Sequence, residues 1–123
     1  MKGISLALTL LTFASCADPG RDARSGVGRV CGPDIETTPC GDGVEAGVPY
    51  RFELLTHCGV EWAYLDGRYW IAAPRIDPPP NWSPIESGTV TLVDDQQARF
   101  ESDSGGQASF RPAPEAYEPP PCA

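Results

Sequence analysis

The chain has 123 residues, a length that holds one small domain and excludes a second domain of enzyme size. Its 13 glycines and 14 prolines interrupt regular helices, so an all-helical bundle is excluded. Acidic residues outnumber basic ones by 17 to 9, and the net charge of −8 at pH 7 excludes nucleic-acid binding, for which Lys and Arg supply most of the affinity.

The amino terminus has the pattern of an export signal. Lys2 precedes an apolar stretch from Ile4 to Ala14. This stretch is about half of the roughly 20 residues that a membrane-spanning helix needs. Residues 1–15 are therefore predicted to be a signal peptide that is cleaved after export.

The end of this segment, Phe13-Ala14-Ser15-Cys16, resembles the lipobox of bacterial lipoproteins. The resemblance implies cleavage before Cys16 and acylation of its thiol by a diacylglyceryl group with chains of the palmitate type. Two acyl chains hold a protein stably on a bilayer, so the mature chain is expected on the extracytoplasmic face of the cell membrane. The alternative is an ordinary secretory signal that leaves Cys16 unmodified.

Large apolar residues are scarce between Ala17 and Gly47. A segment of this composition buries too little surface to offset the entropy of ordering it. Residues 16–47 are accordingly predicted to be the lipidated cysteine and a flexible tether. At the other end, residues 113–123 are rich in proline and are predicted to form an extended tail.

A strand pattern begins at Val48. Tyr50, Phe52, Leu54, Thr56 and Cys58 alternate with polar side chains and are expected to face the core.

The dipeptide Asp66-Gly67 separates two runs of aromatic and aliphatic residues, 60–65 and 68–72, and this arrangement predicts a β-hairpin with a type I′ turn. The turn fixes the register, so that Leu65 faces Arg68, Tyr64 faces Tyr69, Ala63 faces Trp70 and Trp62 faces Ile71. Trp62, Tyr64, Tyr69 and Ile71 then share one face of the hairpin, and Ala63, Leu65 and Trp70 share the other.

The second half of the sequence predicts a long loop and three further strands. Prolines punctuate residues 73–84, and alternating runs follow at 89–93, 98–101 and 107–111 with turn-forming residues between them. The predicted fold is all-β, a small antiparallel sandwich or half-open barrel of about six strands in meander order, over residues 48–112.

Two short motifs within this region resemble a group of short exported bacterial β proteins. They are Thr56-His57-Cys58-Gly59 and Asp66-Gly67-Arg68-Tyr69-Trp70. The resemblance supports the boundaries of the β domain and implies no activity.

Four cysteines besides Cys16 remain, at positions 31, 40, 58 and 122. An even number of cysteines in an exported chain predicts disulfides. The pairing of Cys31 with Cys40 and of Cys58 with Cys122 is favoured, because it closes one local loop and ties the tail to the sheet, and the two crossed pairings stay open.

His57 is the one histidine of the chain, so a zinc site or a histidine-dependent hydrolase would have to use it. Neighbours on a strand point to opposite faces, and His57 and Cys58 would then not meet at one ion. No metal, no cofactor and no catalytic residue are therefore predicted. The acidic residues in turns are interpreted as turn formers.

Aromatic residues are the best candidates for recognition, since exposed rings can stack on sugars or hold an extended peptide. The candidate binding residues are Trp62, Tyr64, Arg68, Tyr69, Trp70 and Trp82. In the competing interpretation, one hairpin face is core and the 74–84 loop covers the other, with Trp82 as its plug.

Together these patterns predict a lipid-anchored, extracytoplasmic and non-enzymatic binding or structural module of the cell envelope. One alternative is a module that binds an envelope glycan or protein through the hairpin aromatics. The other is a small hydrolase that uses His57.

Overall fold

A computed structural model describes Gly3, Ala23 and residues 30–122 of the chain. No helix occurs among these residues, and six strands form one antiparallel sheet. The strands are β1 (Pro49–Leu55), β2 (Val60–Leu65), β3 (Arg68–Ile76), β4 (Ile85–Asp94), β5 (Gln97–Ser102) and β6 (Gln107–Pro112). The prediction of a small all-β domain with about six antiparallel strands is confirmed.

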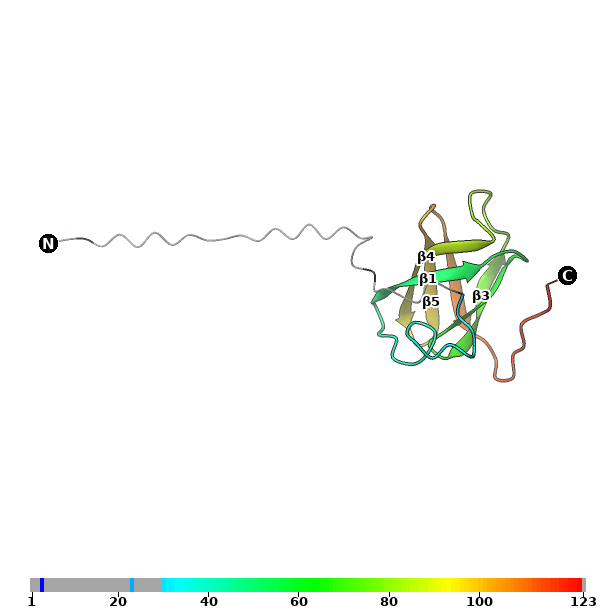
Figure 1. Cartoon of the computed structure of the whole chain (residues 1–123), viewed down its shortest axis with the longest axis horizontal. Coiled ribbons are helices and arrows are strands. Elements are labelled where there is room, and N and C mark those ends of the chain that lie inside the picture. The colour runs from blue at the N-terminus through cyan, green and yellow to red at the C-terminus, as the bar shows by residue number, and fades with distance from the viewer. Residues whose placement is uncertain (1–2, 4–22, 24–29, 123) are drawn as a thin grey trace.

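The sheet has the order β1-β4-β5-β6-β3-β2 and is curled into a half-open barrel (Figure 1). The order is meander-like, because β4, β5 and β6 lie side by side in chain order and β2 pairs with β3. The two edge strands, β1 and β2, are consecutive in the chain and are separated only by residues 56–59. Four residues span no more than about 14 Å, so this short link holds the two edges near each other.

The core fills the inside of the curl. Alternation along each strand turns one set of apolar side chains inward, and Trp70, Phe100 and Phe110 are the largest that are almost completely buried. The buried apolar residues of the six strands are Tyr50, Phe52, Leu54, Val60, Ala63, Leu65, Trp70, Val90, Leu92, Ala98, Phe100, Ala108 and Phe110.

The β2–β3 hairpin has the predicted turn and register. Asp66 and Gly67 both have positive φ angles, 53° and 69°, as a type I′ turn requires. The pairs Leu65–Arg68, Tyr64–Tyr69, Ala63–Trp70 and Trp62–Ile71 are all present. The hairpin therefore presents one buried face and one half-buried face, as the alternation predicts.

The proline-rich loop is shorter than the sequence predicts. β3 continues to Ile76 and includes Pro74, and β4 begins at Ile85. Pro74 is tolerated because the pairing of β3 with β6 ends at Ala72 and the ladder to β2 is irregular between Val60 and Trp62. At this position no regular ladder bond is lost.

Residues 31–47 pack on the sheet, so the predicted tether 16–47 is too long. Cys31 and Cys40 are bonded and buried. The backbone of Pro39 and of Cys40 accepts hydrogen bonds from Asp66 and Gly67, at 2.9 and 2.7 Å. The composition argument failed because a disulfide and backbone hydrogen bonds order this loop, and because its few large apolar side chains, Ile35 and Val44, pack against the core.

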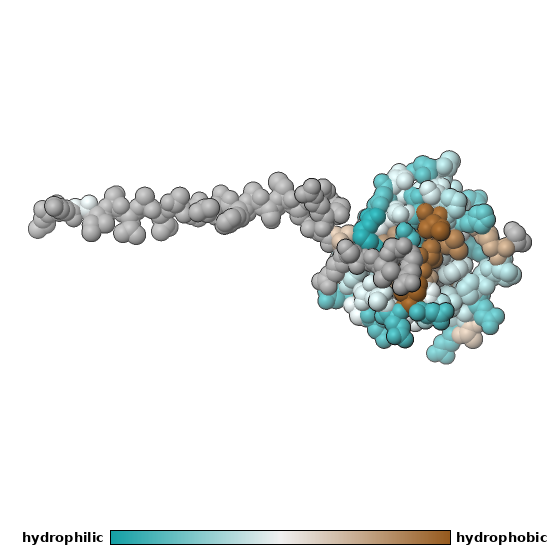
Figure 2. Space-filling view, viewed as in Figure 1, coloured by the Kyte–Doolittle hydropathy of each residue, from teal (hydrophilic) through white to brown (hydrophobic). Residues whose placement is uncertain are grey.

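The signal segment and the lipobox, including Cys16, lie outside the described residues. Where the structure describes the chain, it contains no helix long and apolar enough to cross a bilayer. In the view of Figure 2, most of the described surface is hydrophilic, and a hydrophobic strip lies over the region of β1 and β4. β4 carries the exposed apolar side chains Ile85 and Val93.

Glu86 is a buried carboxylate at the start of β4. It accepts hydrogen bonds from the Ser102 hydroxyl and from the backbone N–H of Ser83, the latter at 2.9 Å. The bond from Ser102 is the main reason that the pKa of Glu86 lies below its ordinary value of 4.5, although burial acts in the opposite direction. The ionised form is therefore the form that the fold stabilises.

We expect the domain to lose stability in acid partly through Glu86. Because the pKa is lower in the folded state, the stabilisation is present above the unfolded-state pKa of 4.5 and is lost as the pH falls through the folded value. Urea unfolding between about pH 6 and about pH 3 checks this expectation. Glu86→Gln should flatten the pH dependence, and an equally steep loss of stability in this variant would contradict the assignment.

Candidate functional site

The outer face of the β2–β3 hairpin carries a cluster of aromatic rings. Tyr69 lies at its centre, edge-on to Trp62 at 5.8 Å and to Tyr64 at 4.9 Å between ring centroids. All three side chains are half-buried. We call Trp62, Tyr64 and Tyr69 the aromatic face.

The C-terminal tail, rather than the 74–84 loop, contacts the aromatic face. The backbone N–H of Ala113 donates to the Tyr69 carbonyl at 3.0 Å, and the ring of Tyr117 lies 5.8 Å from that of Tyr69. Burial raises the pKa of Tyr117 above its ordinary value of 10.0, and the negative charge of Glu61 raises it further. The tail lies on the β3 side of the domain in Figure 1.

The remaining binding candidates from the sequence lie elsewhere. Trp70 is completely buried, and its indole N–H donates to the Leu65 carbonyl at 3.1 Å. Arg68 lies over the Trp70 ring at 4.4 Å, and its guanidinium donates to the Asp95 carbonyl. Trp70 therefore belongs to the core side of the hairpin, whereas the half-buried Arg68 also lines a groove together with Tyr64 and Tyr69.

Trp82 also belongs to the core. Its ring packs edge-on against Phe100 at 5.6 Å, and its indole N–H donates to the Gly105 carbonyl at 2.7 Å. It closes the domain near the β5–β6 turn. The interpretation of Trp82 as a plug over the hairpin is therefore wrong.

The turn between β1 and β2 places His57. β1 ends at Leu55, and the N–H of Gly59 closes a tight turn on the Thr56 carbonyl at 3.0 Å. Gly59 has φ +95°, a conformation that other residues rarely adopt. Thr56 anchors the turn through its backbone N–H to Pro84, at 2.8 Å, and through its buried hydroxyl to Ser83, at 2.6 Å.

This geometry corrects two predictions about the end of β1. Cys58 lies beyond the strand and is not a core residue. His57 and Cys58 do not alternate across a sheet, because the turn, not a strand, sets their directions. The nitrogen ligand of His57 and the sulfurs of Cys58 and Cys122 all lie within 4.8 Å of one another.

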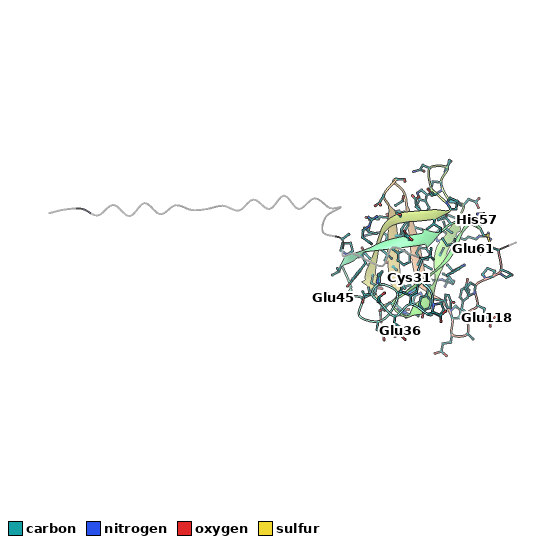
Figure 3. All side chains as sticks on the ribbon, in the orientation of Figure 1. Cys31, Glu36, Glu45, His57, Glu61 and Glu118 are labelled. Atoms are coloured by element: carbon teal, nitrogen blue, oxygen red, sulfur yellow. A yellow bond between two sulfur atoms is a disulfide. The ribbon has the colours of Figure 1, made fainter. Side chains whose placement is uncertain are left out.

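The turn, the first residues of β2 and the tail enclose a groove of about 700 Å³, which we call the His57 groove. Figure 3 shows His57 and Glu61 at the same end of the domain. The groove is lined by Leu55, His57, Cys58, Gly59, Glu61, Trp62, Arg75, Pro120, Pro121 and Cys122. Trp62 thus belongs to both the groove and the aromatic face.

Charged and aromatic side chains meet in the His57 groove. Glu61 and Arg75 form an ion pair with 2.8 Å between carboxylate and guanidinium. Glu61 and Trp62 both face outward because the buried positions Val60 and Ala63 are three residues apart at the irregular end of the ladder. The groove therefore places an aromatic ring beside one positively charged and one negatively charged hydrogen-bonding group.

The disulfide pairing favoured from the sequence is present. Cys31 is bonded to Cys40, and Cys58 is bonded to Cys122 with 5.8 Å between the Cα atoms. The second bond forms one wall of the His57 groove. It also holds Cys58 in a form that lacks a thiolate nucleophile.

Sequence reasoning missed Glu61 and Tyr117 as members of the site. A Glu at the start of a strand and a Tyr in a proline-rich tail carry no signal of their own. The predicted Cys58–Cys122 bond was the available clue, because it requires the tail to return to the β1–β2 turn.

Comparison of the chain with models of known families, with curated proteins and with solved structures finds no match.

Proposed function

We propose that this protein is a lipid-anchored, extracytoplasmic lipoprotein whose β domain is a non-enzymatic binding module of the cell envelope. Its ligand is a glycan of the envelope, bound in the His57 groove. The anchor is the acylated Cys16 of the lipobox. The observation that carries the binding proposal is the meeting of Trp62 with the Glu61–Arg75 ion pair in one open groove.

The chemistry of the groove favours a sugar over other ligands. Sugar rings have apolar C–H faces that pack on an aromatic ring. Their hydroxyls accept hydrogen bonds from a guanidinium and donate hydrogen bonds to a carboxylate. The edge-on contact with Tyr69 fixes the Trp62 ring, so less rotamer freedom is lost on binding. The net charge of −8 disfavours strongly anionic ligands.

The export part of the proposal is supported by the two disulfides together with the lipobox. Disulfides of this kind persist in oxidising compartments outside the cytoplasm. The hydrolase alternative has no such support, since Cys58 beside His57 is bonded to Cys122.

Trp62→Ala is expected to weaken glycan binding by about tenfold or more, because it removes the aromatic wall of the groove. Isothermal titration calorimetry with defined cell-wall oligosaccharides compares the affinities of the wild type and the variants. In the wild type, where Trp70 and Trp82 are buried, a change in tryptophan fluorescence on binding reports mainly on Trp62. Tyr64→Ala is the matched control, because Tyr64 lies on the aromatic face but does not line the groove. Equal binding by wild type and Trp62→Ala, or a response only to proline-rich peptides, would reject the glycan.

Cys16→Ser is expected to move the protein from the membrane fraction to the soluble fraction. Serine offers no thiol for acylation, and an acidic body has little affinity for anionic headgroups. Mass spectrometry of the mature wild-type protein should find an acylated chain that begins at Cys16. A water-soluble wild-type product that still begins at Met1 would refute the anchor.

A further inference from the structure

Three metal-binding side chains from distant parts of the sequence meet at one wall of the His57 groove. A ring nitrogen of His57 and the sulfurs of Cys58 and Cys122 lie within 4.8 Å of one another. We propose that reduction of the Cys58–Cys122 disulfide creates a binding site for a d¹⁰ cation, Zn²⁺ or Cu⁺. The disulfide and the metal complex are then alternative states of the same two sulfurs.

The donor set matches this class of ion. Two thiolates and one imidazole are ligands that Zn²⁺ and Cu⁺ prefer over the oxygen ligands of Mg²⁺ or Ca²⁺. Three protein ligands leave a fourth tetrahedral position on Zn²⁺ for water or an external ligand. His57 is exposed, so that position opens to the solvent of the groove.

The backbone on both sides of the site is held by contacts that do not depend on the disulfide. The β1–β2 turn is fixed by the bonds of Thr56 to Ser83 and Pro84. The tail is fixed by the bond of Ala113 to Tyr69 and by the Tyr117 ring. Tyr117 thus holds the tail five residues from Cys122, whose Cα atom lies 5.8 Å from that of Cys58 in the bonded state. After reduction this short tether keeps the two thiols within reach of one ion.

The cycle balances with a dithiol as the reductant. One of its thiolates attacks the Cys122 sulfur, and Cys58 leaves as a thiolate. The second thiol of the reductant then displaces Cys122, so the reductant becomes a disulfide and two electrons and two protons reach the protein. Zn²⁺ replaces the two thiol protons, which pass to solvent, and its oxidation state does not change. Reoxidation by a disulfide oxidant reverses these steps and releases the ion.

The Cys31–Cys40 disulfide serves as a control for the Cys58–Cys122 disulfide within the same protein. Its cysteines are buried, and the chain's one histidine lies at position 57, in the other pair's site. Within the described part of the chain, no third ligand joins this pair, and the pair lacks the solvent access of the His57 cluster. It is expected to stay oxidised under mild reduction, because buried structural disulfides resist exchange.

Cobalt titration of the full-length chain with the Cys16→Ser substitution tests the proposal. The substitution removes the fifth cysteine, so the oxidised protein has no free thiol once the two disulfides have formed. The oxidised protein should show no cobalt–thiolate charge-transfer absorption. After anaerobic reduction with a phosphine, a band should grow to one Co²⁺ per chain and disappear when Zn²⁺ is added. Thiol counting by mass spectrometry checks which pair has opened.

Variants separate this site from chance binding. His57→Ala should weaken Co²⁺ and Zn²⁺ binding by more than about 100-fold, since even outer-shell changes cost about 10- to 100-fold. Cys58→Ser with Cys122→Ser should abolish the band, and Cys31→Ser with Cys40→Ser should keep it. A reduced wild type without stoichiometric binding, or a band that survives Cys58→Ser with Cys122→Ser, would overturn the proposal.

Near-UV circular dichroism of the buried tryptophans covers the case in which reduction loosens the fold. If Zn²⁺ restores the signal to the reduced wild type but not to His57→Ala, the site is supported, because binding is then coupled to folding. If Zn²⁺ restores neither signal, the proposal fails. Oligosaccharide titration of the oxidised protein is a separate assay, so failure of the metal site leaves the proposed glycan binding intact.

Discussion

Trp70→Ala is expected to lower the free energy of unfolding by about 3 to 5 kcal/mol, the range for removing a large aromatic side chain from a core. Trp70 is completely buried, its indole N–H reaches the Leu65 carbonyl and its ring carries the Arg68 guanidinium. Truncation leaves a cavity in a domain with a small core. Urea denaturation followed by far-UV circular dichroism measures the loss.

Trp62→Ala is the matched control for this prediction. Trp62 lies on the half-buried face of the same hairpin, so its removal should cost only about 1 kcal/mol. Equal losses for the two variants would mean that the two faces of the hairpin are not divided into core and surface as described.

Replacing both Cys58 and Cys122 with serine is expected to cost about 4 kcal/mol of stability. The bond closes a loop with a sequence separation of 64 residues, and the entropy that a disulfide removes from the unfolded chain grows with loop length. Removing the Cys31–Cys40 bond, with a separation of 9, should cost about 3 kcal/mol on the same account. Thermal unfolding of the two double variants gives the comparison.

Comparing the stability lost in the two double variants shows by which mechanism the disulfides stabilise the domain. A larger loss from the 31–40 pair would show that chain entropy is not the main contribution. It would point instead to the packing of the 31–47 loop on the hairpin turn.

The hairpin shows how much of the fold could be predicted from sequence. Asp66-Gly67 determines a turn type, the turn determines the register, and the register assigns Trp62 and Trp70 to opposite faces without further information. Such local rules succeed because each depends on neighbours in the chain. The extra strand length around Pro74 could not be predicted, because it depends on the pairing of Ile76 with Val60 beyond an irregularity in the β2–β3 ladder.

The candidate site illustrates the limits of that reasoning. Its parts come from the β1–β2 turn, the irregular start of β2, the end of β3 and the tail, and no single stretch of sequence contains them. Cys58 was predicted in the core because alternation was continued past Leu55, where the turn at Gly59 ends the strand. Trp82 was linked to the hairpin, although Phe100 and Gly105 hold it near the β5–β6 turn.

The docked loop near the amino terminus also determines where a mechanical load would enter the domain. Pro39 and Cys40 are bonded to the tip of the β2–β3 hairpin, and the Cys31–Cys40 bond prevents the segment between them from lengthening under tension. A pull from the side of the proposed anchor is therefore borne first by the hairpin tip. β1 is an edge strand, and a direct pull on it would break its hydrogen bonds to β4 one after another. The docked loop therefore keeps the force from reaching β1 first.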